Sequence, residues 1–192
     1  MPLPTSGSRR EIHHRQLEMR GYQREDGLFE IEGCVTDAKT YDFQPEGGRE
    51  VPAGKPLHQM WVRLVVDDEL LVHDAMAVTD ANPYTACPDA AAAVAGLKGL
   101  RIASGWAKAV NELMGGVKGC THIREMLMPL ASAAFQTTTS ARMAKPIKLD
   151  AAGRPTKLNS CHAYAVDGPL VLKRFPEFHA SKAGAKTHTK TS

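Results

Sequence analysis

The sequence predicts one α+β domain, in which a small antiparallel sheet of about three strands carries three helices on one face. Two observations lead to this prediction. Residues 28–79 partly alternate apolar and polar side chains and are rich in β-branched and aromatic residues, as strands are. Residues 86–137 instead combine alanine-rich and apolar stretches at helical spacing with glycines and capping residues between them. Strands followed by helices are typical of α+β folds.

The strands are expected in three segments. Residues 28–43 form a strand or a hairpin, and the Gly- and Pro-rich residues 44–56 form a loop. Residues 57–66 alternate cleanly and form the second segment. A tight turn at Asp67-Asp68 then leads into a returning strand at 69–80, so that the last two strands make an antiparallel hairpin.

Three helices are expected after the strands, at residues 88–98, 106–114 and 121–137. Pro88 suits the first turn of the first helix, since a missing N–H costs nothing there. Pro129 lies inside the third helix, where it predicts a kink. Further along, Asp167-Gly168 between two apolar stretches predicts a last hairpin turn.

The ends of the chain are basic, although the net charge of the 192 residues is only +3. Residues 1–26 are predicted to be a basic N-terminal segment, polar and largely irregular over 1–20; residues 27–175 are predicted to be the single domain, and residues 176–192 a disordered basic tail. Basic ends can contact nucleic acid, but no aromatic residues are interleaved with these charges, so we expect solvated termini and no nucleic-acid partner.

The expected compartment is the cytoplasm. The sequence has no run of about 18 apolar residues that could cross a membrane, and its first residues lack the apolar core of a secretory signal. In a reducing compartment cysteines are thiols or metal ligands rather than disulfides. This applies to all four cysteines, Cys34, Cys87, Cys120 and Cys161.

Two of these cysteines are predicted to open helices. Cys87 precedes the helix at 88–98, and Cys120 precedes the helix at 121–137. A helix N-terminus favours thiolate, the form that binds metal or attacks carbon. Together with His58, these cysteines make a candidate site for zinc or iron. The alternative is that they are buried small side chains, because no zinc-finger spacing is present.

Three further residues are candidates for catalysis. Tyr84, three residues before Cys87, could donate or accept a proton, and Arg63 could bind a carboxylate. His122 follows Cys120 by two residues and adds an imidazole to the same region. Packing for Tyr84 and a solvated strand face for Arg63 are the alternatives. Asp37 is a further candidate acid or base.

The order of parts over residues 57–136 resembles the iron–sulfur cluster scaffold superfamily of NifU, IscU and SufU. The segments that carry this resemblance are PLHQMWVRLVVDDELLVHDAMAV, YTACPDAAAAVAGL and KGCTHIREMLMPLASAA. It implies an IscU-like fold in which His58, Cys87 and Cys120 converge. Because His58 stands where the scaffolds have their first cysteine, a single metal on a Cys/His site fits better than a three-thiolate cluster.

Over nearly its whole length the chain also resembles an uncharacterised bacterial family, catalogued as a domain of unknown function. The matching stretches include YQREDGLFEIEGCVTDAKTYDF, ANPYTAC, GGVKGCTH and NSCHAYAVDG. This resemblance implies a shared fold and site. Some members look like companions of aromatic or steroid degradation pathways, which points towards catabolism.

The functional hypothesis that follows is a metal-assisted enzyme, either a lyase or a hydrolase. Its expected substrate is a small organic compound, and the resemblance to companions of degradation pathways favours an aromatic one. Three protein ligands leave a coordination position open, which can polarise an oxygen or activate water. The alternatives are an iron–sulfur or metal carrier without catalytic activity, and a structural protein with inert thiols. The expected partner is a small molecule, and a homo-oligomer is compatible with the sequence.

Overall fold

The computed structural model describes residues 3–4 and 7–180. The chain forms two compact units, Met1–Arg142 and Met143–Ser192. The segment 27–175, which the sequence predicts to be one domain, spans both units. Among the described residues, no helix is both long and apolar enough to cross a membrane.

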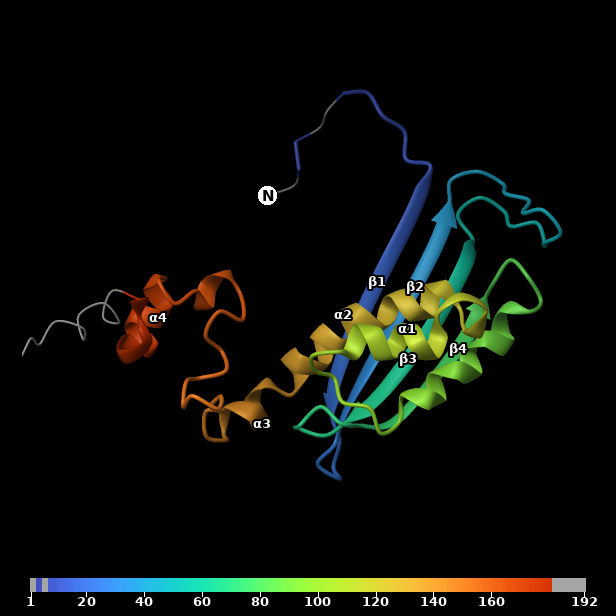
Figure 1. The fold of residues 1–192 in the computed structure, drawn as a ribbon. Helices are drawn as coiled ribbons and strands as arrows, with labels where there is room; N and C mark the ends of the chain where they lie inside the picture. The colour runs from blue at the N-terminus through green and yellow to red at the C-terminus, as the bar shows by residue number, and fades with distance from the viewer. Residues whose placement is uncertain (1–2, 5–6, 181–192) are drawn as a thin grey trace, which may run out of the picture. The chain divides into compact units, whose positions relative to one another are not determined.

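The first unit is built on a four-stranded antiparallel sheet whose strands follow chain order (Figure 1). They are β1 (His13–Gln23), β2 (Phe29–Lys39), β3 (Pro56–Val66) and β4 (Val72–Ala81). The α+β class and the antiparallel sheet are therefore confirmed, and β2, β3 and β4 lie in the three segments expected to form strands. The sheet has one strand more than the sequence predicts.

The additional strand is β1, which lies in the N-terminal segment expected to be irregular. That expectation is wrong for His13–Gln23, which pairs with β2 along its whole length. As an edge strand with one neighbour, β1 is mostly exposed, and only Leu17, Met19 and Gly21 supply small or apolar side chains on its core-facing side. Its polar composition therefore hides its strand character.

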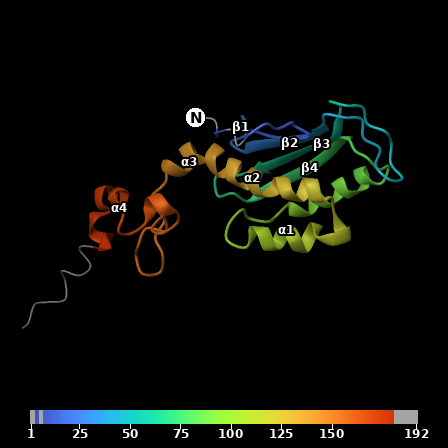
Figure 2. The ribbon, with the colours of Figure 1, turned by 90° about the horizontal axis from the view of Figure 1, so that it is seen from above.

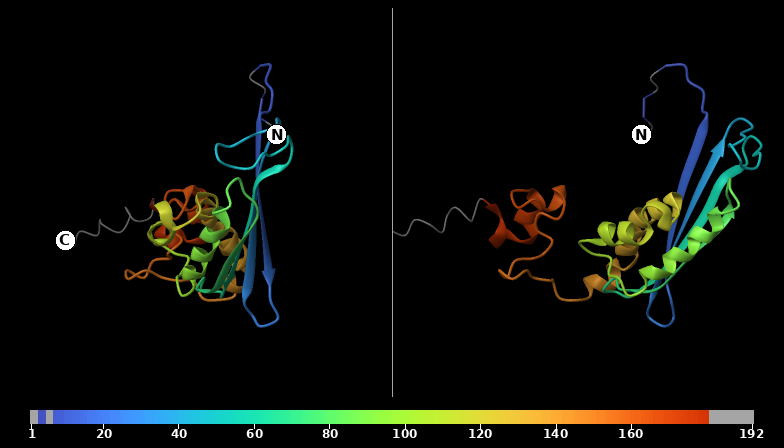
Figure 3. Two further views of the ribbon diagram at one scale, coloured as in Figure 1. Left: turned by 90° about the vertical axis from the view of Figure 1, so that its right-hand side faces the viewer. Right: turned by 45° about the vertical axis from the view of Figure 1, so that its right-hand side comes forward.

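Helices cover one face of this sheet, and Figures 2 and 3 show the sheet and the helices as two layers. η1 (Cys87–Leu97) lies against β4, and α2 (Thr121–Thr137) lies against β1, β2 and β3, while α1 (Trp106–Met114) packs on both of these helices. The short helix η2 (Gly116–Lys118) precedes α2 in the chain, and α3 (Thr139–Met143) follows it. The three expected helices correspond to η1, α1 and α2. The first of them is a 3-10 helix, and Pro129 lies inside α2.

The core of the first unit lies between the sheet and these helices. Alternate residues of β2 and β3 point into it, as the period of a strand requires. Each fully buried aliphatic side chain contributes about 1.5–3 kcal/mol to folding. The residues that are fully inaccessible to solvent include Ile31, Met60, Leu64, Val66, Leu97, Ile123, Leu127 and Leu130.

In the described part of the second unit, up to residue 180, the secondary structure includes the short helices η3 (His162–Tyr164), α4 (Pro169–Arg174) and η4 (Pro176–Phe178). The expected hairpin turn at Asp167-Gly168 is wrong, because Gly168 is the N-cap of α4 and Pro169 occupies its first turn. Of the tail expected to be disordered, residues 181–192 lie outside the described residues.

Candidate metal centre

A row of polar side chains crosses the sheet at one end of the core. Arg15 of β1 pairs with Asp37 of β2, and Asp37 pairs with His58 of β3. The adjacent row on the same face is apolar and consists of Leu17, Val35 and Met60. Asp37 therefore ends the apolar stripe of β2, and it is as buried as that stripe, with 2% of its surface exposed.

The first turn of α2 adds a second imidazole to this row. The rings of His122 and His58 are stacked, with their centroids 3.8 Å apart and their planes inclined by 30°. His58 Nδ1 lies 3.3 Å, and His122 Nε2 3.8 Å, from Oδ2 of Asp37. Segments far apart in the sequence thus bring two nitrogens to one carboxylate oxygen.

Asp37, His58 and His122 each offer one ligand atom, and these three atoms all lie within 4.8 Å of one another. Within the part of the chain that the structure describes, no other group of three or more His, Cys, Asp or Glu side chains is as close. We refer to these three residues as the His–Asp cluster.

Asp37 is ionised despite its burial. Burial alone would raise the pKa of its carboxyl group. Hydrogen bonds from Arg15 and from His13, whose Nε2 lies 2.9 Å from Oδ1, outweigh that effect and lower the pKa to about 2. Arg15 also donates to Glu125 of α2 at 3.3 Å, so that one guanidinium links β1, β2 and α2.

The two imidazoles of the cluster are neutral at neutral pH. Burial lowers the pKa of His58 to about 4. Repulsion from the protonated form of His122 lowers this pKa further, and attraction to Asp37 opposes both effects. Burial also lowers the pKa of His122. Neutral imidazoles beside an ionised carboxylate are the protonation states that metal binding requires.

One buried atom of the cluster lacks a hydrogen bond. Nδ1 of His58 is inaccessible to solvent and makes no well-formed hydrogen bond, although its charged neighbour Asp37 lies 3.3 Å away. An unsatisfied buried polar atom costs about 1–3 kcal/mol and calls for an explanation. A metal ion bound by this nitrogen would remove that cost.

The predicted metal ligands come together only in part. His58 is in the cluster, and Cys120 lies next to it, with Sγ 3.8 Å from Nδ1 of His122. Cys87 stands half-buried at the start of η1 and belongs to no group of three ligands among the described residues. His122, expected to be catalytic, is the second imidazole, and Asp37 supplies the carboxylate.

The other predicted site residues are dispersed. Arg63 lies on the opposite face of the sheet from His58, between Glu30 and Asp74. Tyr84 lines a hollow of about 450 Å³ together with residues 47–49 and 82–86. Trp106, the first residue of α1, is a core residue whose indole Nε1 donates to the backbone of α2.

The ligand that sequence reasoning missed is Asp37, which it considered only as an acid or base. A signal was present: Phe29, Ile31 and Val35 mark the inward positions of this strand, and Asp37 continues their alternation. A carboxylate at a core position must be paired or bind a metal. Arg15 and His13 were missed because β1 itself was missed.

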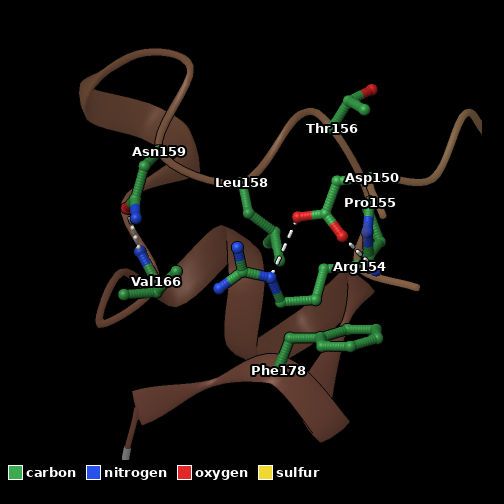
Figure 4. Close-up of a pocket in the computed structure, with 8 residues that line it drawn as sticks. All are labelled: Asp150, Arg154, Pro155, Thr156, Leu158, Asn159, Val166 and Phe178. Atoms are coloured by element: carbon green, nitrogen blue, oxygen red, sulfur yellow. Dashed lines mark hydrogen bonds and ion pairs between the residues drawn. The ribbon is translucent and has the colours of Figure 1, made fainter. Parts of the chain in front are cut away.

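The second unit has a hollow of its own, about 280 Å³ in volume, shown in Figure 4. Its polar groups bind one another. Asp150 accepts hydrogen bonds from Nε and the backbone N–H of Arg154, and Asn159 accepts one from the backbone of Val166. With these groups satisfied internally, the hollow offers no set of free ligands.

Comparison with known protein families gives one match. The model of a family described as "Protein of unknown function (DUF2889)" matches residues 13–136, a range that contains β1 and all three members of the His–Asp cluster. No curated protein and no solved structure matches the chain. The resemblance to iron–sulfur scaffolds is thus not supported, whereas the resemblance to an uncharacterised domain family is confirmed.

Proposed function

The chain belongs to the DUF2889 family, and we propose that it is a metal-assisted enzyme, a lyase or a hydrolase, that acts on a small organic substrate. In this proposal Asp37, His58 and His122 hold the metal. The observation that carries it is the convergence of three ligand atoms within 4.8 Å from β2, β3 and α2.

The donor set suits zinc or iron(II). Two imidazoles and one carboxylate are a common ligand set for both metals, and they leave room for water or a substrate oxygen. Bonds of about 2.0–2.1 Å in a tetrahedral site separate two ligand atoms by roughly 3.3 Å. The His58–Asp37 separation of 3.3 Å equals that value. The His122–Asp37 separation is 3.8 Å, and because the two rings are stacked, one imidazole must turn for both nitrogens to face one ion.

Arg15 supports the ligand role of Asp37 rather than blocking it. Each carboxylate oxygen has two lone pairs, so Oδ2 can accept the hydrogen bond from Nη2 of Arg15 and still bind a cation. Carboxylate ligands of metals are usually hydrogen-bonded in this way, which fixes their orientation. His13 and Arg15 therefore position Asp37.

Solvent and substrate can reach the cluster, since the side chains of His58 and His122 are 13% and 25% exposed. The hollow lined by Tyr84 opens at the same end of the sheet, because Gln59 at the start of β3 pairs with Ala81 at the end of β4. In this proposal the hollow holds the carbon skeleton of the substrate, which is an aromatic ring if the protein acts in aromatic catabolism. Tyr84 transfers a proton.

A second candidate function is that of a metal carrier without catalytic activity. The observation that favours it is the pair of sulfur atoms beside the cluster, where Cys120 lies close to His122 and to Met60. Additional donors at the border of a site provide a path by which an ion can be handed on. Turnover by the metal-loaded protein separates the two candidates.

The experiment compares metal-free full-length protein with protein loaded with Zn²⁺ or, without oxygen, with Fe²⁺. Substrates are a panel of small aromatic esters, amides and β-hydroxy acids. The enzyme hypothesis predicts one ion per chain and turnover only after loading, with both lost in His58→Gln. His73→Gln is the matched control, since His73 binds Asp67 on an exposed part of the sheet. One bound ion that passes rapidly to a chelator, without turnover, favours the carrier, and no bound ion refutes both.

A further inference from the structure

Beside the His–Asp cluster, where the start of α2 lies over β3, the sulfur of Cys120 contacts a second sulfur and an imidazole nitrogen. Sγ of Cys120 is 3.7 Å from Sδ of Met60 and 3.8 Å from Nδ1 of His122. Met60 is fully buried, and Cys120 is half-buried at the N-cap of α2. We propose that Cys120, Met60 and His122 form a second metal site, for a soft monovalent ion of the Cu⁺ class.

The two separations from Cys120 Sγ match two edges of a trigonal site. With bonds of about 2.3 Å to sulfur and 2.0–2.1 Å to nitrogen, a trigonal ion separates two sulfurs by roughly 4.0 Å and sulfur from nitrogen by roughly 3.7 Å. The observed separations are 3.7 Å for the two sulfurs and 3.8 Å for sulfur and nitrogen. Each of these two separations is within a few tenths of an ångström of its trigonal value.

The chemistry of the donors selects the ion. A thioether binds Cu⁺ and contributes little to the binding of zinc, magnesium or calcium. Charge balance also favours Cu⁺, because one thiolate and one monovalent cation have a net charge of zero. A half-buried site can hold such a neutral pair without leaving an uncompensated charge, whereas a divalent ion would leave one.

His122 belongs to both sites through opposite nitrogens. Its Nε2 faces Asp37 and its Nδ1 faces Cys120. A neutral imidazole has one free lone pair, so an ion bound at one nitrogen leaves the proton on the nitrogen that the other site needs free. Cu⁺ binding therefore weakens binding of a divalent ion at the His–Asp cluster, and the reverse holds by linkage.

This inference does not rest on the proposed function, because it uses neither Asp37 nor His58. The experiment titrates reduced full-length protein with Cu⁺, without oxygen, in competition with the chromogenic chelator bicinchoninate. The background is Cys34→Ser, Cys87→Ser, Cys161→Ser, which leaves Cys120 as the single thiol; circular dichroism checks that it is folded. The expected result is one Cu⁺ per chain, three-coordinate by X-ray absorption with two sulfurs and one nitrogen.

Two ligand variants and one control are made in this background. Met60→Leu, which conserves volume, and His122→Gln are each expected to weaken Cu⁺ binding about tenfold or more, while His73→Gln, outside both sites, leaves it within about threefold. Affinity for Cu⁺ that is unchanged in Met60→Leu and His122→Gln would show that the Cys120–Met60 contact is packing only and would overturn the proposal. Failure of zinc binding in the parent protein bears on the proposed function alone.

Discussion

The guanidinium of Arg15 donates two hydrogen bonds to the carboxylate of Asp37, from Nε to Oδ1 and from Nη2 to Oδ2, both at 2.8 Å. This bidentate pair joins the edge strand β1 to β2 at the place where the apolar core ends. It holds in position the same carboxylate that faces the two stacked imidazoles. The stability of the first unit and the geometry of the cluster therefore depend on the same contact.

Replacing Arg15 by alanine should destabilise the protein by about 2–4 kcal/mol, because it leaves the buried charge of Asp37 without its main partner. Urea unfolding monitored by circular dichroism measures the loss. The matched control is Arg20→Ala on the same strand, because its ion pair with Glu18 is exposed to solvent and contributes little to stability. Equal stability of the two variants would contradict this role of Arg15.

The free energy of unfolding should fall as the pH drops from about 6.5 to about 4. In this window the unfolded chain protonates His58, whose ordinary pKa is 6.5, while the folded chain holds it neutral because burial lowers its pKa to about 4. The unfolded state then binds more protons, so acid favours it. Below that window, protonation of Asp37, with a folded pKa of about 2, continues the loss.

Urea unfolding at several pH values, with chelator present, tests this dependence. His58→Gln should flatten the slope between pH 6.5 and 4, by a total on the order of 1–3 kcal/mol. His14→Gln, at an exposed position of β1, serves as the control. A slope in His58→Gln as steep as in the parent would refute the assignment.

Gly21→Ala should destabilise the protein by about 1–3 kcal/mol, because an added methyl group would stand 2.8 Å from Cβ of Thr137 at the end of α2. Without that neighbour, alanine in a strand would instead stabilise by about 0.4–1 kcal/mol. The sign of the change in the free energy of unfolding, measured with urea, therefore shows whether β1 packs against α2. Gln16→Ala, on the other face of β1, should change little.

Adding Zn²⁺ to metal-free protein should raise the free energy of unfolding by about 2.7 kcal/mol at a hundredfold excess over the dissociation constant. EDTA should reverse the gain. Asp37→Asn and His58→Gln should show none of it, whereas His73→Gln should show all of it. Thermal unfolding followed by circular dichroism makes the comparison, and a full gain in His58→Gln would exclude this residue as a ligand.

The sequence predicts β3, β4 and α2 well because local signals act together there. Alternation is clean in 57–66, and the N-cap position of Cys120 and the apolar stripe around Leu127 fix the third helix. β1 escapes prediction because an edge strand needs few apolar residues, and His13–Gln23 has only Leu17 and Met19 facing the core in a row of charges.

The site is predictable only in part, for a different reason. His58 and His122 attract attention as imidazoles near strand and helix starts, but their partner depends on sheet register, which no local pattern reveals. The register pairs His58 with Asp37, so the neighbouring ligand is a carboxylate, whereas a thiolate was expected. Cys87 satisfies the local criteria of a ligand, yet it starts η1 outside the cluster.

The most direct test of the central claim is anomalous X-ray diffraction from crystals of the full-length protein soaked with Zn²⁺ and measured on both sides of the zinc absorption edge. The predicted result is one anomalous peak within about 2.0–2.2 Å of Asp37 Oδ2, His58 Nδ1 and one nitrogen of His122. Zinc bound only elsewhere, for example at Cys87 or Cys161, with the His–Asp cluster free of anomalous density, would contradict the account.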